Sequence, residues 1–216
     1  MKKRILFITD SLALPRTLPE KIMYEETYLY ILKEKYPTID FLHVGVGGGT
    51  IKKLFDYSQY FHETLNPSLV FIQSGIVDCS PRALKEFELD LLNRIPIIGK
   101  LILHLVKINS NSLRSIRNIQ YTSISDYISY IKLFESIFKK IVWIEILPPV
   151  KEYNDKVRNI GTKINIYNNE IRKQTHISCI DFKKEFVQSD FHHLSVLGHI
   201  ELANKISEKI DLEYLK

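Results

Sequence analysis

Short apolar runs alternate with longer segments of helical periodicity along most of the chain. Five short runs are rich in Ile, Val, Leu and Phe: 4–9, 39–44, 69–74, 141–146 and 177–181. Runs of this length and composition predict buried strands. The segments between them repeat apolar residues every three or four positions, over 24–36, 124–138, 160–171 and 197–210, which predicts amphipathic helices. Alternating strands and helices predict a parallel sheet with right-handed crossovers and helices on both faces.

Length and composition narrow the class of protein. A chain of 216 residues suits a single domain, here taken as 1–216, and 45% hydrophobic with 25% charged residues is typical of a globular protein. The net charge of +5 permits an anionic ligand or a membrane surface without requiring either. We expect no nucleic-acid partner. Because two cysteines make no disulfide framework and the longest apolar stretch, 95–106, is too short to span a bilayer, we expect a cytoplasmic protein.

The connection between the third and fourth predicted strands is longer than one crossover needs. It holds the apolar stretch 95–106 and the basic tract 107–118. We therefore predict a helical insertion at about 83–120, and two interpretations stay open. It is an extra helical element packed on the body, or it is a lid or a docking surface over the site. In the second case Lys100, Lys107, Arg114 and Arg117 would meet an anionic ligand, or the segment would contact a membrane or another subunit.

Polar and glycine residues follow the predicted strands where a parallel sheet binds its ligands, outside the carboxyl ends. Asp10 and Ser11 follow the first strand, a glycine-rich run at 45–49 follows the second, and a polar cluster at 75–82 follows the third. Asp190-Phe191-His192-His193 lies near the C-terminus. A serine, a glycine turn and an Asp-x-x-His pair are the parts of an acyl-transfer site.

Four blocks in this order resemble the SGNH hydrolases, the GDSL-like lipase and esterase superfamily. Thr9-Asp10-Ser11-Leu12 stands where that family has Gly-Asp-Ser-Leu, and Gly45-x-x-Gly48-x-Thr50 is similar to its second block. Gly75-Ile76-Val77-Asp78 is similar to the third block, and Asp190-x-x-His193 to the last. The resemblance covers nearly the whole chain. It implies a three-layer α/β sandwich with a five-stranded parallel sheet, similar to a flavodoxin-like arrangement.

The resemblance also implies a role for each matching residue. Ser11 would be the nucleophile, His193 its general base, and Asp190 the carboxylate that orients the imidazole. The backbone N–H groups of Ser11 and Gly48 would form the oxyanion hole. Four residues in or near these blocks are candidates for contact with the substrate: Asp10, Gly75, Asp78 and Arg82. No metal and no cofactor are expected.

One departure from the family pattern bears on activity. Val77 occupies the position of the asparagine that donates the third oxyanion hydrogen bond, and valine cannot donate one. Losing such a donor costs about 10²–10³ in turnover. Arg82, Arg16 and Gln73 are near enough in sequence to the blocks to replace it.

Each feature also has a simpler interpretation. Ser11 could cap the helix that follows it, and the glycine run could bind phosphate at a helix N-terminus. His192 and His193 could form a metal pair, although we expect adjacent side chains to diverge. Cys79 could be a nucleophile in place of Ser11.

The sequence thus favours an SGNH-like serine hydrolase that acts on an ester. The resemblance implies an O-acyl group on a carbohydrate, such as a bacterial surface polysaccharide, with transfer of the acyl group as a variant of the same chemistry. The alternative is a degenerate, non-catalytic member that binds a glycan or a partner protein. Its oligomeric state is left open.

Overall fold

A five-stranded sheet forms the centre of the protein. The computed structural model describes residues 3–214, apart from the side chains of Ser115 and Tyr214; residues 1, 2, 215 and 216 of the expected domain lie outside that range. The strands are β1 (Arg4–Thr9), β2 (Asp40–Gly45), β3 (Leu69–Gln73), β4 (Ile141–Ile144) and β5 (His176–Ile177). Their order is β2-β1-β3-β4-β5, and every neighbouring pair is parallel. The predicted five-stranded parallel α/β sandwich is confirmed.

The last two strands are shorter than the apolar runs suggest. The run 177–181 leaves the sheet after Ile177 because the N–H of Cys179 donates to the carboxylate of Glu145, 3.1 Å away, and not to a strand. Similarly, the N–H of Ile146 donates to the side-chain oxygen of Asn168 at 2.9 Å. Beyond the ends of these two strands, side chains therefore accept the hydrogen bonds that a neighbouring strand would otherwise accept. The apolar pattern of the sequence does not indicate where a strand ends in this way.

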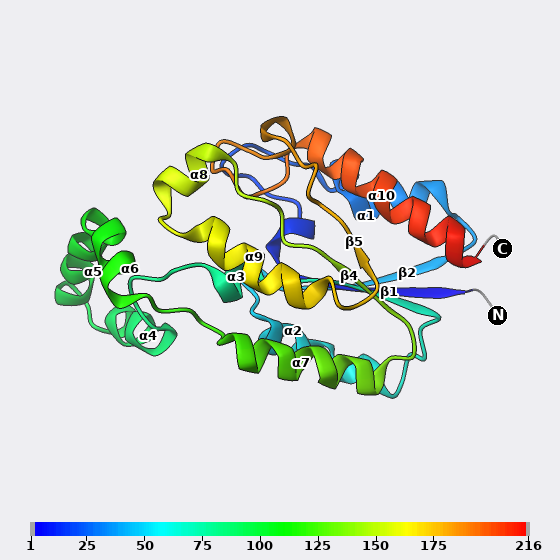
Figure 1. Ribbon diagram of the computed structural model, residues 1–216, viewed down its shortest axis with the longest axis horizontal. Coiled ribbons are helices and arrows are strands. Elements are labelled where there is room, and N and C mark those ends of the chain that lie inside the picture. The colour runs from blue at the N-terminus through cyan, green and yellow to red at the C-terminus, as the bar shows by residue number, and fades with distance from the viewer. Residues whose placement is uncertain (1–2, 215–216) are drawn as a thin grey trace.

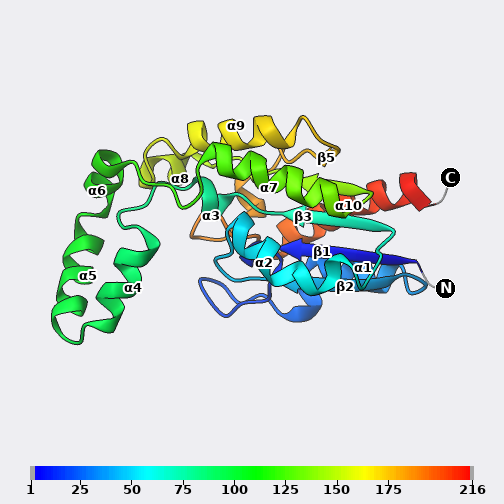
Figure 2. The ribbon, with the colours of Figure 1, turned by 90° about the horizontal axis from the view of Figure 1, so that it is seen from below.

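Helices cover both faces of the sheet (Figures 1 and 2). One face carries α1 (Tyr28–Lys35) and α10 (Val196–Tyr214), and the other carries α2 (Ile51–His62), α7 (Ile124–Ile137) and α9 (Ile160–Ile171). Short helical turns complete the fold: η1 (Ser11–Ala13), η2 (Tyr24–Glu26), α3 (Ile76–Cys79), α8 (Lys151–Lys156) and η3 (Lys184–Phe186). The predicted helix 24–36 divides into η2 and α1 because the Thr27 side chain caps α1 and accepts from the N–H of Tyr30.

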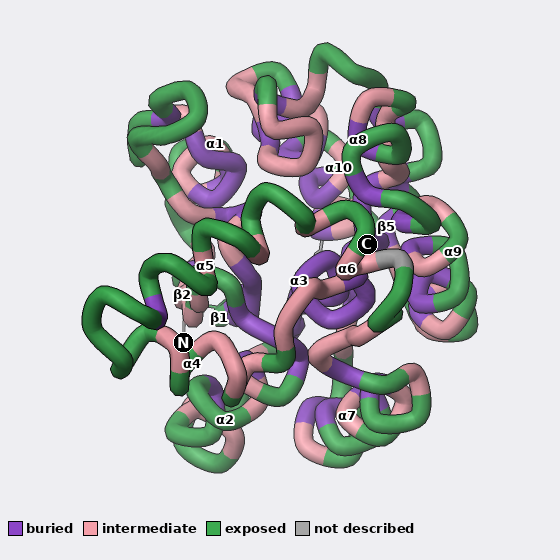
Figure 3. Tube along the Cα trace, turned by 90° about the vertical axis from the view of Figure 1, so that its left-hand side faces the viewer, coloured by how far each residue is buried: buried purple, intermediate pink, exposed green. Residues whose placement is uncertain are grey.

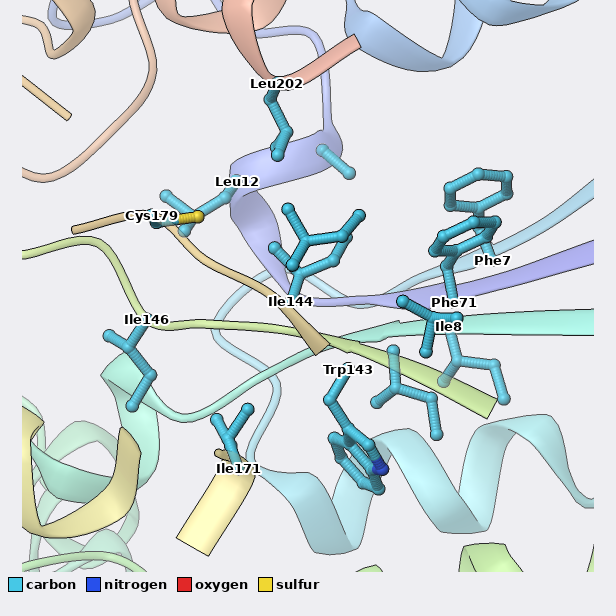
Figure 4. Close-up of a cluster of buried hydrophobic side chains, with 14 of the residues drawn as sticks. Phe7, Ile8, Leu12, Phe71, Trp143, Ile144, Ile146, Ile171, Cys179 and Leu202 are labelled. Carbon is cyan, nitrogen blue, oxygen red and sulfur yellow. The ribbon is translucent and has the colours of Figure 1, made fainter. Parts of the chain in front are cut away.

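The core follows from the alternation of side chains along the strands. Phe7 and Phe71 are register partners on β1 and β3, and their rings stack with centroids 4.9 Å apart. Phe7 also packs against Tyr28 of α1. Trp143 lies on the opposite face, where its ring meets Phe134 of α7 edge-on at 5.9 Å (Figure 4). Both faces of the sheet are thus sealed by aromatic side chains.

Three helices extend beyond the carboxyl end of the sheet (Figures 1 and 2), and most of their residues are exposed (Figure 3). We call α4 (Glu86–Arg94), α5 (Ile98–Ile108) and α6 (Ser110–Arg117) the arm. The chain enters and leaves the arm at one point, where the N–H of Arg82 donates to the carbonyl of Ile119 at 2.8 Å. Many of its large apolar side chains are exposed: Phe87, Leu91, Ile95, Ile97, Ile98, Leu101, Ile102, Leu105, Ile108 and Ile116. Within residues 3–214, no helix has the length and apolarity needed to cross a membrane.

Candidate active site

The register of the sheet brings the ends of the strands into one row. Thr9 of β1 pairs with Gly45 of β2 and with Gln73 of β3. Gln73 pairs in turn with Ile144 of β4, which pairs with Ile177 of β5. The loops that follow the strands therefore begin side by side at the carboxyl edge, where open parallel sheets bind their ligands.

Ser11 opens the turn after β1, with its side chain directed to His193. The Ser11 Oγ lies 3.3 Å from the Nε2 of His193. The cap of η1 is Asp10, whose Oδ1 accepts from the N–H of Leu12 at 2.9 Å. The simpler interpretation, in which Ser11 caps this helix, is therefore wrong, because the neighbouring aspartate performs that role.

A compact turn before α10 holds His193 and Asp190. The N–H of Gln188 donates to the carbonyl of His193, and Phe191 adopts a left-handed conformation with φ of 71°. Asp190 Oδ1 accepts from the backbone N–H groups of His192 and His193, at 3.2 and 3.1 Å. This leaves Oδ2 to accept from the Nδ1 of His193 at 2.5 Å. Ser11, His193 and Asp190 thus form one continuous hydrogen-bonded series.

The surroundings of Asp190 favour its ionised form. Partial burial opposes the charge, but the hydrogen bond from His193 and the nearby His192 outweigh it and hold the pKa of Asp190 below its usual range. The carboxylate is therefore charged at neutral pH and accepts a hydrogen bond from the Nδ1–H of His193. This leaves the Nε2 of His193 free to accept a proton from Ser11.

His192 does not diverge from His193, contrary to our expectation. The two ring centroids are 4.0 Å apart, so both side chains lie on the same side of the chain. His192 stacks on Tyr153 of α8, with centroids 5.5 Å apart and an interplanar angle of 16°. Burial lowers the pKa of His192 to about 4, so this ring is neutral. Sequence reasoning gave His192 no structural part in the site.

Asp190, His192 and His193 offer ligand atoms within 4.8 Å of one another, so these side chains could approach a metal ion. However, His193 Nδ1 and Asp190 Oδ2 are already joined by their short hydrogen bond. A metal bound to these two atoms would replace that bond. The arrangement is therefore suited to orienting the imidazole of His193.

The glycine turn after β2 is held in place from inside the protein. Gly48 has φ of +63°, a conformation that side chains other than glycine rarely adopt. The first N–H groups of α2 are already satisfied, since that of Ile51 donates to Asp78 at 3.0 Å and that of Lys53 to the Thr50 hydroxyl at 3.3 Å. These two N-terminal amides of α2 are therefore not free to bind a phosphate.

Three of the four candidate substrate contacts have structural roles instead. Asp10 and Asp78 are buried, and burial raises the pKa of Asp10 to about 7 and that of Asp78 to about 6. Asp78 also accepts from the Thr122 hydroxyl, so it joins α3, α2 and the segment before α7. At Gly75, with φ of +124°, a Cβ atom would lie 2.4 Å from the side chain of Ile146. All three residues shape the edge from within and do not line the pocket beside Ser11.

That pocket has a volume of about 220 Å³. Its lining comes from five segments that are distant in sequence: Ser11, Ile76, Val77, Ser80, Arg82, Arg114, Tyr153, Lys156, Val157, Asp190 and His192. Arg82 is the one candidate substrate contact among them. Cys79, by contrast, is fully buried, and burial raises the pKa of its thiol well above the usual range, so it is not a competing nucleophile.

No protein-family model and no curated protein matches the sequence. Solved structures match over nearly the whole chain. A lipase/acylhydrolase from Enterococcus faecalis has a TM-score of 0.64 and 14% identity, over 96% of this chain and 95% of that one. A member of the lipolytic G-D-S-L family from Veillonella parvula has 0.59 and 12%, over 95% and 97%. A catalytic mutant of an acetylxylan esterase from Geobacillus stearothermophilus has 0.56 and 15%, over 97% and 96%.

The chain has the SGNH-hydrolase fold. At identities of 12–15%, this likeness shows the fold alone, and the chemistry of the site depends on the residues that form it.

Val77 is where this SGNH fold departs from the pattern of the superfamily, and it lines the pocket beside Ser11. Two of the three candidate replacement donors do not line the pocket. Arg16 donates to the carbonyl of Ser11 at 2.7 Å and does not line the pocket. Gln73 is buried and outside the pocket lining; its side-chain oxygen accepts from the Tyr28 hydroxyl, and its Nε2 has no partner in the described residues. Arg82 lines the pocket next to Val77, whose carbonyl it contacts at 3.3 Å.

The arm contributes one side chain to this pocket. Arg114 of α6 is part of the lining, whereas Lys100 and Lys107 of α5 are not. Arg117 donates to both carboxylate oxygens of Glu88, at 2.7 and 2.8 Å, and so joins α6 to α4. Of the four basic residues expected near a ligand, Arg114 alone borders the pocket. Sequence reasoning missed Tyr153 and Lys156, because α8 carries no motif that points to the site.

Proposed function

We propose that this protein is a serine esterase that works through Ser11, His193 and Asp190. The observation that carries the proposal is the unbroken hydrogen-bonded series from the Ser11 hydroxyl through the imidazole to the carboxylate. The likeness to lipase, acylhydrolase and acetylxylan esterase structures supports the same class of reaction.

In the first step of the proposed reaction, Ser11 Oγ attacks the carbonyl carbon of the ester while His193 Nε2 accepts the hydroxyl proton. The tetrahedral intermediate then collapses, the bond to the alcohol breaks, and His193 returns the proton to the leaving oxygen. Asp190 keeps the Nδ1 proton in place and stabilises the imidazolium. Water attacks the acyl-enzyme in the second step by the same route. A sugar hydroxyl in the place of that water would make the reaction an acyl transfer.

The negative charge on the carbonyl oxygen needs hydrogen-bond donors. We assign the backbone N–H groups of Ser11 and Gly48 to this role, because they lie in the turns after β1 and β2. Val77 offers no side-chain donor at the third position. The Arg82 guanidinium, which lines the same pocket, is the candidate that replaces it.

We propose an O-acylated carbohydrate as the substrate. An acetylxylan esterase is among the proteins of similar fold. The lining of the pocket includes the polar side chains of Ser80, Tyr153 and Arg82. Four further points stay predictions: a setting in bacterial polysaccharide synthesis, a cytoplasmic location, the absence of a nucleic-acid partner, and a peripheral contact with membranes.

Labelling with a fluorophosphonate tests the proposal directly, because the probe reacts with an activated serine. We expect wild-type protein to be labelled at Ser11, as read by mass spectrometry of the modified peptide, and to cleave para-nitrophenyl acetate. Ser11→Ala should lose both properties. Ser136→Ala, which removes an exposed serine on α7, is the matched control and should keep both.

A second candidate function is glycan binding without catalysis, and Val77 is the observation that favours it. In that case Ser11 would stay unlabelled, and acetylated oligosaccharides would bind equally to wild-type protein and to Ser11→Ala. Labelling at Ser11 together with ester cleavage would exclude this candidate.

A further inference from the structure

We infer that the pocket beside Ser11 binds a negatively charged group of the ester substrate, a carboxylate or a phosphate. The inference rests on the proposed function for the reaction, and it adds the chemical class of the substrate. It starts from the charges around the pocket, which the motifs of the sequence do not explain.

Three cationic side chains from separate segments line this small pocket. Arg82 follows α3, Arg114 comes from α6 in the arm, and Lys156 comes from α8. Within the described part of the chain, none of the three makes an ion pair with a carboxylate. Asp190 is the acidic residue of the lining, and its oxygens already accept from His192 and His193. The lining of the pocket therefore holds three cationic side chains and one carboxylate, that of Asp190, which leaves an excess of positive charge.

The two arginines also have unused hydrogen-bond donors. The Nε atoms of Arg82 and Arg114 are both buried, and neither has a hydrogen-bond partner in the described residues. The Arg82 guanidinium is held over the ring of Tyr121, with its central carbon 4.8 Å from the ring centroid, and its Nη2 donates to Val77. A buried donor without a partner is unfavourable, and an anionic acceptor in the pocket would be attracted by the charge of both guanidinium groups.

The size of the pocket limits the group that it can hold. Its volume of about 220 Å³ is below the range of about 300–1,000 Å³ that is common for drug-sized ligands. It suits a short charged acyl group or one charged sugar unit. The charge can thus lie on either side of the ester bond, on the acyl group or on the alcohol.

Arg82 has two candidate roles, and they predict different kinetics. As an oxyanion donor it would assist neutral and anionic esters equally. As part of an anion site it would assist anionic esters selectively. The decisive substitutions are therefore made at Arg114 and Lys156, which are not candidates for the oxyanion hole.

The experiment compares two matched pairs of esters. In the first pair, para-nitrophenyl hemisuccinate carries a charge on its acyl group and para-nitrophenyl butyrate does not. In the second pair, para-acetoxybenzoate carries a charge on its alcohol part and para-acetoxybenzamide does not. In one pair we expect wild-type protein to prefer the anion by roughly tenfold in kcat/KM, which is the scale of one charge-assisted hydrogen bond. The preference should decrease with added salt.

The double substitution Arg114→Gln with Lys156→Gln should bring this preference close to one. Lys151→Gln, at an exposed lysine of the same helix α8 but outside the pocket lining, is the control and should keep it. Lys156→Gln alone changes an exposed side chain, and it should lower the preference in part if the double variant does not fold. Equal rates for the anionic and neutral esters of both pairs in wild-type protein would overturn the inference.

A binding measurement separates this inference from the proposed function. If the protein cleaves no ester and Ser11 is not labelled, the esterase proposal fails, and the anion site is then judged by calorimetric titration with succinate and with inorganic phosphate. Binding of either anion that disappears in the double variant supports the site. Absence of binding by both anions to wild-type protein overturns it.

Discussion

The carboxyl edge of the sheet and the arm lie at the same end of the molecule, but they are built in opposite ways. At the edge, even titratable side chains are enclosed, because Asp10 and Asp78 are buried and accept hydrogen bonds from neighbouring backbone N–H groups. In the arm, apolar side chains such as Ile98 and Leu101 are about 60% exposed, at 62% and 60%. The arm reaches the pocket through Arg114. This contrast indicates that the edge depends on the core for its geometry and that the arm adds little to folding.

The largest effect is expected at the edge. Asp190→Asn keeps the shape of the side chain but removes the charge that fixes the proton on His193 Nδ1. We expect kcat for an activated ester to fall by about 10⁴-fold. Asp155→Asn, on the exposed side of α8, should retain activity. A loss of less than tenfold for Asp190→Asn would mean that Asp190 does not orient the imidazole.

The same substitution, phenylalanine to alanine, can be made in the core of the sheet and in the arm. Phe71 is fully buried in the stack with Phe7, whereas Phe87 on α4 is 64% exposed. Phe71→Ala should lower the free energy of unfolding by about 3–5 kcal/mol, because it leaves a cavity in the core. Phe87→Ala should change it by about 0.5 kcal/mol or less. Urea denaturation measures both, and similar losses would show that the arm is part of the cooperative core.

The buried carboxyl group of Asp10 predicts a pH dependence that the arm does not share. Native Asp10 keeps its proton up to about pH 7, whereas the unfolded chain releases it near pH 4. The native state therefore binds more protons in this range, and the free energy of unfolding falls as the pH rises from about 4 to about 7. Asp10→Asn should remove this part of the slope in urea titrations at several pH values.

The control for that measurement is Asp90→Asn, which changes an exposed carboxyl in the arm and should leave the slope unchanged. The buried histidines titrate in wild-type protein and in the variant alike, so the difference between the two isolates Asp10. Identical slopes for wild-type protein and Asp10→Asn would show that Asp10 is ionised in the folded state.

A smaller effect is expected at Val77. An asparagine there would add an oxyanion donor, and one donor is worth about 10²–10³ in turnover in a site built for it. We expect about tenfold, or about 1.4 kcal/mol, because the pocket was not shaped around that rotamer. Steady-state kinetics with para-nitrophenyl acetate measures the gain. No gain, together with a loss for Arg82→Gln, would identify Arg82 as the existing donor.

The smallest effect on stability is expected from removing the arm. A short Gly-Ser linker can replace residues 86–117 because Arg82 and Ile119 are already hydrogen-bonded neighbours. The free energy of unfolding should change by less than about 1 kcal/mol, since loop closure depends weakly on length. Preference for anionic esters should decrease with the loss of Arg114. An unfolded product would show that the arm is required by the core.

The sequence determined the parts of this protein that depend on local pattern. Apolar runs placed β1, β2 and β3 to within a residue at each end, and periodicity placed α7 and α9, because burial on a sheet or a helix face requires those spacings. The order of the four blocks also singled out Ser11, Asp190 and His193, which are 182 residues apart at the extremes and in contact in the fold.

Tertiary structure alone decided what depends on residues that are distant in sequence. Asp10 and Asp78 resemble surface candidates in the sequence, but packing from several elements encloses them and turns them into backbone supports. His192 joins the site, where it stacks on the ring of Tyr153, a residue 39 positions earlier in the sequence. The cationic pocket is assembled from three loops and helices that share no motif. Local sequence specifies which residues are available, and the packing of distant segments determines which of them meet, since contact, burial and charge balance are properties of the folded chain.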